Sequence, residues 1–410
     1  MWETKISWKL IVWMLILLSM SILGFYAWYV IRMIPGNENI NQFVPWGILP
    51  PLYIFLVTSG TCLVLSLGEV FEIEKFKAIV RRALWLSVAT LLIGLFVIIL
   101  DLGRPERFYY TFIGCANLSS PMFWMIYLYV AETIFLLIEF WFIFRRDFAL
   151  IANKSSGLKR FFYRLLSLGT TDASVESMRR DLKIARGVGF MTLVLALAAY
   201  SNLGNIFAVL ANRSFWYGSL IPVKIVITAF VLGSALTILA SVTVYWARKK
   251  EMSFELKKSL LELRKLVVLS IVVYLFFISW EYTSKAWSTS PDIYESVLTV
   301  FTGPIAFEFW VFEIIFGLIT PFLILAIPKL GKTLPGLFTA ALLITIGIFS
   351  CRYDMVVGGL IPPVLPGTPH GAYVPSAMES LFTIGVFSLV TLIVVIGELI
   401  IPLDEPLPVE

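Results

Sequence analysis

The sequence has a single histidine, His370, and only three cysteines, Cys62, Cys115 and Cys351, in 410 residues. One histidine excludes a haem held by two histidines of this chain and the usual histidine-rich metal centres. The cysteines lie far apart, with no C-x-x-C pair, which argues against a structural zinc site or an iron–sulfur cluster ligated by this chain alone. We expect them to be small apolar side chains that fill space between helices.

Charge is also scarce. Charged residues make up 14% of the chain and hydrophobic residues 59%, and the mean hydropathy is +0.89. A soluble globular domain does not tolerate this composition, so the sequence predicts an all-α integral membrane protein.

Apolar stretches long enough to span a membrane occur ten times. They cover residues 8–34, 51–71, 79–101, 121–144, 186–211, 220–247, 264–284, 305–328, 334–352 and 378–402. The first is too long for a signal-peptide core and has no cleavage site, so we expect it to remain as a helix of the mature protein. The predicted architecture is two four-helix bundles, helices 2–5 and 6–9, flanked by helices 1 and 10, in a single membrane domain.

Lysine and arginine are distributed unevenly between the two sides. Of 32 such residues, only seven fall on the side opposite the N-terminus: Arg32, Arg104, Arg107, Arg213, Lys224, Lys285 and Arg352. Residues 145–185 form the most basic loop, on the N-terminal side. The positive-inside rule therefore predicts that both termini are cytoplasmic, that this loop lies against the anionic membrane surface, and that the net charge of +5 requires no nucleic-acid partner.

The outer loops are rich in proline, glycine and aromatic residues. One of them begins with D-L-G-R-P-E-R, residues 101–107, directly after an uncharged run. Such ordered, aromatic surfaces suit docking of another protein.

Acidic residues within the predicted spans point to proton transfer. Glu132 follows Pro121 by 11 residues, which places it about 16 Å into helix 4, near the middle of the bilayer. Glu139 lies two turns further along the same face, so the two acids are candidates for a proton relay. Glu313 and Glu379 lie toward the outer ends of helices 8 and 10. The alternative is that these charges form interfacial salt bridges that fix the helix ends.

Several motifs resemble one known family. They are P-W-G-I-L-P-P at the start of helix 2, D-L-G-R-P after helix 3, N-L-S-S-P-M before helix 4, A-A-Y-S-N in helix 5, F-W-V-F-E-I-I-F-G in helix 8 and R-Y-D-M-V-V-G-G after helix 9. In this order they resemble the NrfD/PsrC family of quinone-binding membrane subunits, and in particular its ten-helix branch, which includes membrane subunits of hydrogenase-2 and of sulfate-reducer redox complexes.

The resemblance implies a helix bundle without haem or iron–sulfur clusters that binds menaquinone or ubiquinone near its outer surface. It also implies a docked ferredoxin-like iron–sulfur subunit, and beyond it a catalytic subunit of molybdopterin, hydrogenase or similar type. The expected location is the inner membrane of a prokaryote.

The same resemblance suggests which residues contact the quinone. Tyr200 resembles a tyrosine that donates to a quinone oxygen, and the segment F-V-P-W-G places Trp46 at the pocket. Asp101 resembles a buried acid that exchanges a proton with the quinone. It could instead pair with Arg104, itself a candidate contact, or with Arg107.

Arg352 has two readings. It could hold Glu313 or Glu379 ionised, or it could orient a quinone head group with its planar guanidinium.

The leading functional hypothesis is exchange of two electrons and two protons with a membrane quinone, with Glu132 and Glu139 as an inward proton route. Two alternatives belong to other classes of protein. A secondary transporter would also place acids inside a ten-helix bundle, although the sequence shows no inverted repeat. A passive anchor would only hold a partner complex at the membrane.

Overall fold

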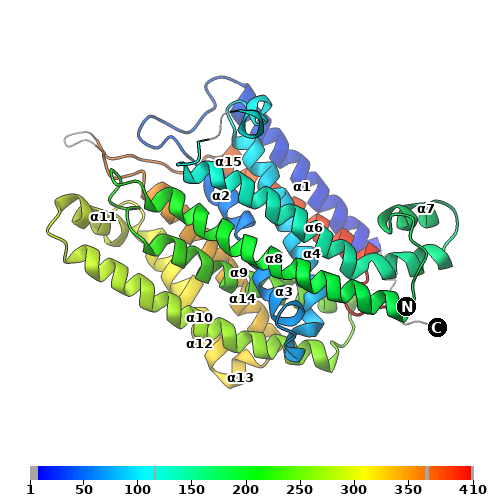
Figure 1. The fold of residues 1–410 in the computed structure, drawn as a ribbon. Helices are drawn as coiled ribbons and strands as arrows, with labels where there is room; N and C mark the ends of the chain where they lie inside the picture. The colour runs from blue at the N-terminus through cyan, green and yellow to red at the C-terminus, as the bar shows by residue number, and fades with distance from the viewer. Residues whose placement is uncertain (1–7, 115–116, 365–368, 408–410) are drawn as a thin grey trace.

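A computed structural model describes residues 8–114, 117–364 and 369–407; Cys115 lies outside these ranges. The described residues form helices and no strands, and nine of the helices are long and apolar enough to cross a membrane. The prediction of an all-α integral membrane protein is confirmed. The long helices run roughly side by side in one bundle (Figure 1).

Two helices form a pair on the outside of the bundle: α1, Trp8–Met33, packs along α15, Ala377–Ile400. Gly24 and Gly385 face each other where the pair is closest, and a Cβ on either would lie 2.6 Å from the other's Cα. Most of α1 is exposed, because its other faces are apolar and meet lipid.

The remaining long helices form two groups, each continuous through its contacts. The first comprises α2 (Leu49–Val57), α3 (Thr61–Glu69), α4 (Lys77–Asp101), α6 (Pro121–Lys154) and α8 (Val175–Ala208). The second comprises α9 (Leu220–Arg248), α10 (Phe254–Ala286), η3 (Glu308–Ile319) with α12 (Thr320–Ala326), and α14 (Leu334–Tyr353) with η4 (Asp354–Gly358). Contacts of α9 with α3 and α8 join the groups.

The second predicted helix is broken, since α2 ends at Val57 and α3 begins at Thr61. The eighth is wound as a π-helix over Glu308–Ile319, with i→i+5 hydrogen bonds. Such winding is rare and is often found at functional sites. Short helices fill the connections: η1 (Glu74–Phe76), η2 (Pro105–Arg107), α5 (Tyr110–Ile113), α11 (Pro291–Phe301) and α13 (Pro328–Gly331).

The basic segment 145–185 is mostly helical rather than a loop. It holds the last turns of α6, the separate helix α7 (Gly157–Leu166) and the start of α8. In α7, Leu158, Phe161 and Leu165 are exposed beside basic residues, the pattern of a helix that lies on a membrane surface. The start of α1 and the end of α15 lie at the same end of the bundle as α7 (Figure 1). We call this the α7 end, and the other the Asp101 end.

A network of buried ion pairs closes the α7 end. Arg82 of α4 donates to Glu398 of α15 at 2.6 Å and to Asp404 at 2.7 Å, and Arg248 of α9 donates to the same two carboxylates at 2.8 and 2.9 Å. Burial raises the pKa of Asp404, but the facing Arg82 and Arg248 outweigh burial and hold that pKa below its ordinary value. The stability that Asp404 contributes is therefore present at neutral pH and is lost as the pH falls into the acid range.

Because Arg82 is 1% exposed, its removal leaves the buried Glu398 with one arginine partner instead of two, and it also takes one partner from the partly exposed Asp404. We predict that Arg82→Met lowers the free energy of unfolding by about 3–5 kcal/mol, as measured by SDS titration of the purified protein in mixed micelles. Lys77→Met is the control, since Lys77 pairs with Glu74 at the surface and its loss should cost less than about 1 kcal/mol. Equal losses of unfolding free energy in Arg82→Met and Lys77→Met would show that burial of the network adds nothing to stability.

Candidate functional site

The break in the second span sets the centre of the bundle. Gly60 has φ +67°, the left-handed region, and a Cβ there would collide with the backbone of Ala229 in α9. Gly233, one turn further along α9, packs against the Gly60 backbone from the same side. Only glycine allows this approach. The break leaves Thr58 beside α9, and its hydroxyl donates to the carbonyl of Ile54 at 2.6 Å.

A buried thiol, phenol and carboxylate lie together on the α7 side of the break. The Cys62 sulfur lies 3.1 Å from the Tyr200 hydroxyl, which donates to Oε1 of Glu132 at 3.4 Å. All three side chains are at most 3% exposed, and they come from α3, α8 and α6. Oε2 of Glu132 has no hydrogen-bond partner among the described residues. We call Cys62, Tyr200 and Glu132 the first triad.

A second buried acid continues from the first triad toward the α7 end. Glu139 is fully buried and lies against Gly189 of α8, where a Cβ would come within 2.8 Å of its Oε1. The charge of Glu69, at the end of α3, acts on it. At the surface beyond, Glu72 pairs with Arg186. The acids thus form a series from the first triad to the α7 end.

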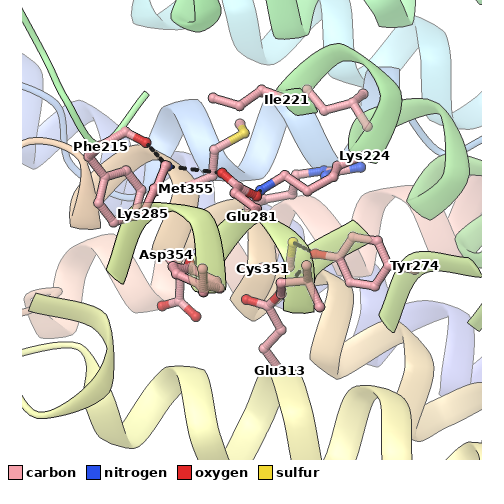
Figure 2. A pocket seen from close by; sticks show the side chains of 14 residues that line it. Phe215, Ile221, Lys224, Tyr274, Glu281, Lys285, Glu313, Cys351, Asp354 and Met355 are labelled. Carbon is pink, nitrogen blue, oxygen red and sulfur yellow. Dashed lines mark hydrogen bonds and ion pairs between the residues drawn. The ribbon is translucent and has the colours of Figure 1, made fainter. Parts of the chain in front are cut away.

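The second helix group has a triad of the same chemistry. The Tyr274 hydroxyl donates to Oε1 of Glu313 at 2.8 Å and lies 3.3 Å from the Cys351 sulfur. These side chains belong to α10, η3 and α14, and they line one cavity (Figure 2). We call them the second triad.

Three further charges line the same cavity on its Asp101 side. Glu281 lies between Lys224 of α9 and Lys285 of α10, and it pairs with both (Figure 2). The two lysine side chains are 18% and 15% exposed, whereas Glu313 is 5% exposed. Asp354 of η4 is buried and also lines the cavity. Within this cavity the lysines are therefore more exposed than Tyr274 and Glu313.

Arg352 stands between the two triads. It follows Cys351 in the chain, is 1% exposed, and donates to the hydroxyls of Thr228 at 2.8 Å and Thr58 at 3.4 Å. Among the described residues it forms no ion pair, either with Glu313 or with Glu379. Tyr129, also buried, lies within electrostatic reach of both Arg352 and Glu132.

Asp101 is the last residue of α4 and belongs to neither triad. The guanidinium of Arg32 donates to its backbone carbonyl at 3.2 Å, and the charge of Asp101 acts on the partly buried Tyr53 of α2. Arg104 and Arg107 are exposed, and in the part of the chain that the structure describes they form no ion pair with Asp101. No hydrogen bond joins Asp101 to Tyr200 in these ranges either.

Trp46 and Glu379 lie at the Asp101 end. Trp46 stacks on the buried Trp216, with ring centroids 5.9 Å apart. Glu379 caps the first turn of α15 and accepts from Tyr373 at 2.9 Å and from Asn39 at 2.6 Å. These are the contacts of a carboxylate that fixes a loop to a helix end, and its place in a proton pathway stays a prediction.

Tyr200 and Glu132 are thus brought together, whereas Asp101, Trp46 and Glu379 lie away from them at the Asp101 end. Cys62, Tyr274 and Cys351 were not among the predicted site residues. Cys62 and Cys351 pack in or against the hydrophobic core, as expected, and each thiol also contacts a phenol. Their spacing along the chain carried no signal, because the three members of each triad come from three different helices.

An all-helical membrane bundle with acids buried beside phenols, and with an arginine between them, belongs to the class of membrane proteins that keep ionisable groups inside the bilayer, where such groups usually serve function. Residues 36–363 match the family described as polysulphide reductase, NrfD, and because this match covers most of the chain, the protein belongs to that family. The resemblance inferred from the motifs is confirmed.

Three relatives extend over nearly the whole chain. It is 26% identical to a subunit of selenate reductase from Mesobacillus selenatarsenatis, with 94% of this chain and 93% of the relative covered. It is 26% identical to the Hdr-like menaquinol oxidoreductase integral membrane subunit of Archaeoglobus fulgidus, with 93% and 91% covered. It is 22% identical to the menaquinone reductase integral membrane subunit of Nitratidesulfovibrio vulgaris, with 90% and 86% covered.

Gly60→Ala tests whether the broken helix holds the site together. We predict a loss of more than about 3 kcal/mol in the free energy of unfolding, because the new Cβ meets backbone that cannot move aside. Gly157→Ala is the matched control, since Gly157 has φ +60° but open space around it, and should cost about 1–2 kcal/mol. SDS titration measures both; a loss at Gly60 no larger than at Gly157 contradicts the prediction.

Proposed function

We propose that this protein is the quinone-reactive membrane subunit of a respiratory oxidoreductase complex. It exchanges electrons between the membrane quinone pool and an iron–sulfur subunit docked at the Asp101 end, and it moves protons across the membrane. The observation that carries the proposal is the hydrogen bond between Tyr200 and Glu132, buried at the centre of a chain whose relatives include a subunit named for a menaquinol oxidoreductase. The α7 end faces the cytoplasm, because lysine and arginine concentrate there.

The residues present fit a quinone head group in chemistry. A quinone supplies two-electron chemistry coupled to two protons when bound, and it needs hydrogen-bond donors beside an apolar passage. Asp101 lies close to lipid-facing side chains of α4, Phe96 and Ile99, and to the phenol of Tyr53. The buried phenol of Tyr129 and Oε2 of Glu132 have no hydrogen-bond partner among the described residues, so the centre holds spare polar groups as well.

Each candidate has a distinct task under this proposal. Asp101 receives or gives a proton at the outer boundary, and Tyr200 donates its hydroxyl hydrogen bond at the centre. Glu132, Glu139 and Glu69 pass protons between the first triad and the cytoplasm, which makes turnover electrogenic. Because Asp101 and Tyr200 share no hydrogen bond, their variants separate two possible positions of the quinone.

Docking of the iron–sulfur subunit is proposed for the segment that begins at Arg104. Tyr109, Tyr110 and Ile113 are 51%, 46% and 69% exposed there, and Arg104 and Arg107 are exposed beside them. Exposed aromatic and arginine side chains are typical of protein interfaces. The catalytic subunit, which sets the terminal substrate, would lie beyond this partner.

Quinol oxidation by the purified complex in proteoliposomes tests the site. We expect Asp101→Asn or Tyr200→Phe to lower kcat/KM for a soluble menaquinol analogue by at least about tenfold, because loss of a positioned proton carrier costs roughly 10²–10⁴ in typical enzymes. Trp124→Phe, an exposed change at the same end, is the control. Unaltered kcat/KM values in both Asp101→Asn and Tyr200→Phe would contradict the site assignment.

Charge movement tests the proton route separately. We expect Glu132→Gln to retain quinol oxidation in part but to abolish the membrane potential that turnover generates, because an amide cannot carry a proton. A voltage-sensitive dye in the same vesicles gives the potential. Glu106→Gln, at an exposed acid, is the control. Full charge movement in Glu132→Gln excludes this carboxylate from the route.

A further inference from the structure

Arg352 is a buried cation with only neutral hydrogen-bond partners among the described residues. Its guanidinium donates to two threonine hydroxyls, and its Nε has no partner in those ranges. Arg352 acts on Glu313 through its charge but forms no ion pair with a carboxylate among the described residues. Burying a charge without an ion-pair partner in a membrane protein is costly, and such a group often serves function. Four other buried arginines, Arg81, Arg82, Arg145 and Arg146, lie within ion-pair distance of carboxylates. Buried Arg264 of α10 forms no ion pair among the described residues either, and it donates to the carbonyl of Leu325 at 2.6 Å.

The place of Arg352 relates the two triads. It is the neighbour of Cys351 in α14, and its partner Thr58 lies at the break that directly precedes the helix of Cys62. Its other partner, Thr228, lies one turn from Lys224 and donates to the carbonyl of that lysine at 2.7 Å. The guanidinium is thus fixed between the break in helix 2 and the cavity of the second group.

The groups on the two sides of Arg352 lead to opposite surfaces. On one side the cavity runs from the partly exposed Lys224 and Lys285 to Glu313 (Figure 2). On the other side Glu132 is followed by Glu139 and Glu69 toward the α7 end. Each half offers proton-binding side chains up to the arginine.

We propose that Arg352 is an electrostatic barrier that separates two half-channels, an outer one ending at Glu313 and an inner one ending at Glu132. A guanidinium stays charged in proteins, so it repels a proton that approaches from either side, and in a low-dielectric interior that repulsion is strong. The two hydroxyl acceptors hold the guanidinium in place and leave its charge intact. A carboxylate partner would neutralise that charge. Protons then cross only when turnover changes the charge of the triads, and the membrane does not leak at rest. This inference rests on the proposed function, since only a subunit that moves protons needs such a barrier.

The test measures passive proton entry rather than turnover. The purified complex is reconstituted into vesicles that contain a pH-sensitive dye, and a potassium diffusion potential is applied without quinol. We expect Arg352→Gln to raise the rate of proton entry at least about tenfold over the wild-type complex. The repulsion between the guanidinium and a proton at close range is larger than the change in barrier height that gives a tenfold change in rate. Arg352→Lys keeps the charge and should restore a tight vesicle, which a purely structural role would not explain.

Two further variants complete the design. Arg213→Gln is the matched control: Arg213 also donates to neutral acceptors, the carbonyls of Gly359, Leu360 and Pro362, but it lies toward the Asp101 end outside both half-channels. It should leave the vesicle tight. Thr228→Val removes the nearer acceptor of Arg352 and should give a leak smaller than that of Arg352→Gln. This variant tests the barrier if Arg352→Gln is not recovered in folded form.

The outcomes separate this inference from the proposed function. Vesicles that stay tight in both Arg352→Gln and Thr228→Val, or that leak equally in Arg213→Gln, overturn the barrier. A wild-type complex that oxidises quinol without generating a potential contradicts proton translocation instead, and it does so whatever the variants show. Leak in Arg352→Gln with rescue by lysine supports the barrier.

Discussion

The cost of placing charge inside an apolar bundle governs this structure, and the protein meets that cost in two ways. At the α7 end, Arg82, Arg248, Glu398 and Asp404 neutralise one another through ion pairs. At the centre, Glu132 and Glu313 receive hydrogen bonds from phenols instead. A carboxylate held by arginine stays ionised, whereas one held by a neutral donor can gain and lose a proton. The first arrangement suits a structural lock and the second a proton carrier.

The break in the second span makes the central arrangement possible. A continuous helix would have kept Thr58 within regular turns, and its backbone could not have approached α9 at Gly60 and Gly233. The break also supports neighbouring hydroxyls, since Ser59 contacts Thr90 at 2.7 Å. Broken helices are common in transporters, but there they come in pairs at matching places in two halves. Here the eighth span is irregular in another manner, as a π-helix without a gap.

Much of the fold followed from composition alone. Apolar length gives the helices, and Glu132 was found because it lies near the middle of the apolar span 121–144, which has no cation at that depth. The sequence also predicted that residues 145–185 are basic, but not that they fold largely as helix, since α7 is too short and too charged to resemble a span. The broken second helix was missed because V-T-S-G-T has no proline, and a single glycine inside an apolar run is compatible with a regular helix.

The parts of the site that were missed depend on three-dimensional packing. Cys62 and Tyr200 are separated by 138 positions, and Tyr274 and Cys351 by 77, so no local pattern could pair them. The motif resemblance suggested Asp101 and Tyr200, on different predicted helices, as parts of one quinone site, and this stays a prediction. In the structure their neighbours differ, since Arg32 lies beside Asp101 and Cys62 beside Tyr200.

The similarity of the two triads has a consequence for how the protein could work. Each triad holds one carboxylate, one phenol and one thiol, so neither has an intrinsic preference for the proton over the other. What distinguishes them is their surroundings: Lys224 and Arg352 lie near Glu313, whereas Glu132 is followed by further acids. Cations attract the negative charge of a carboxylate, and neighbouring acids repel it. Under the proposed function, the two chemically alike sites stand in opposite electrostatic surroundings, one toward each surface, and turnover supplies the driving force for proton movement between them.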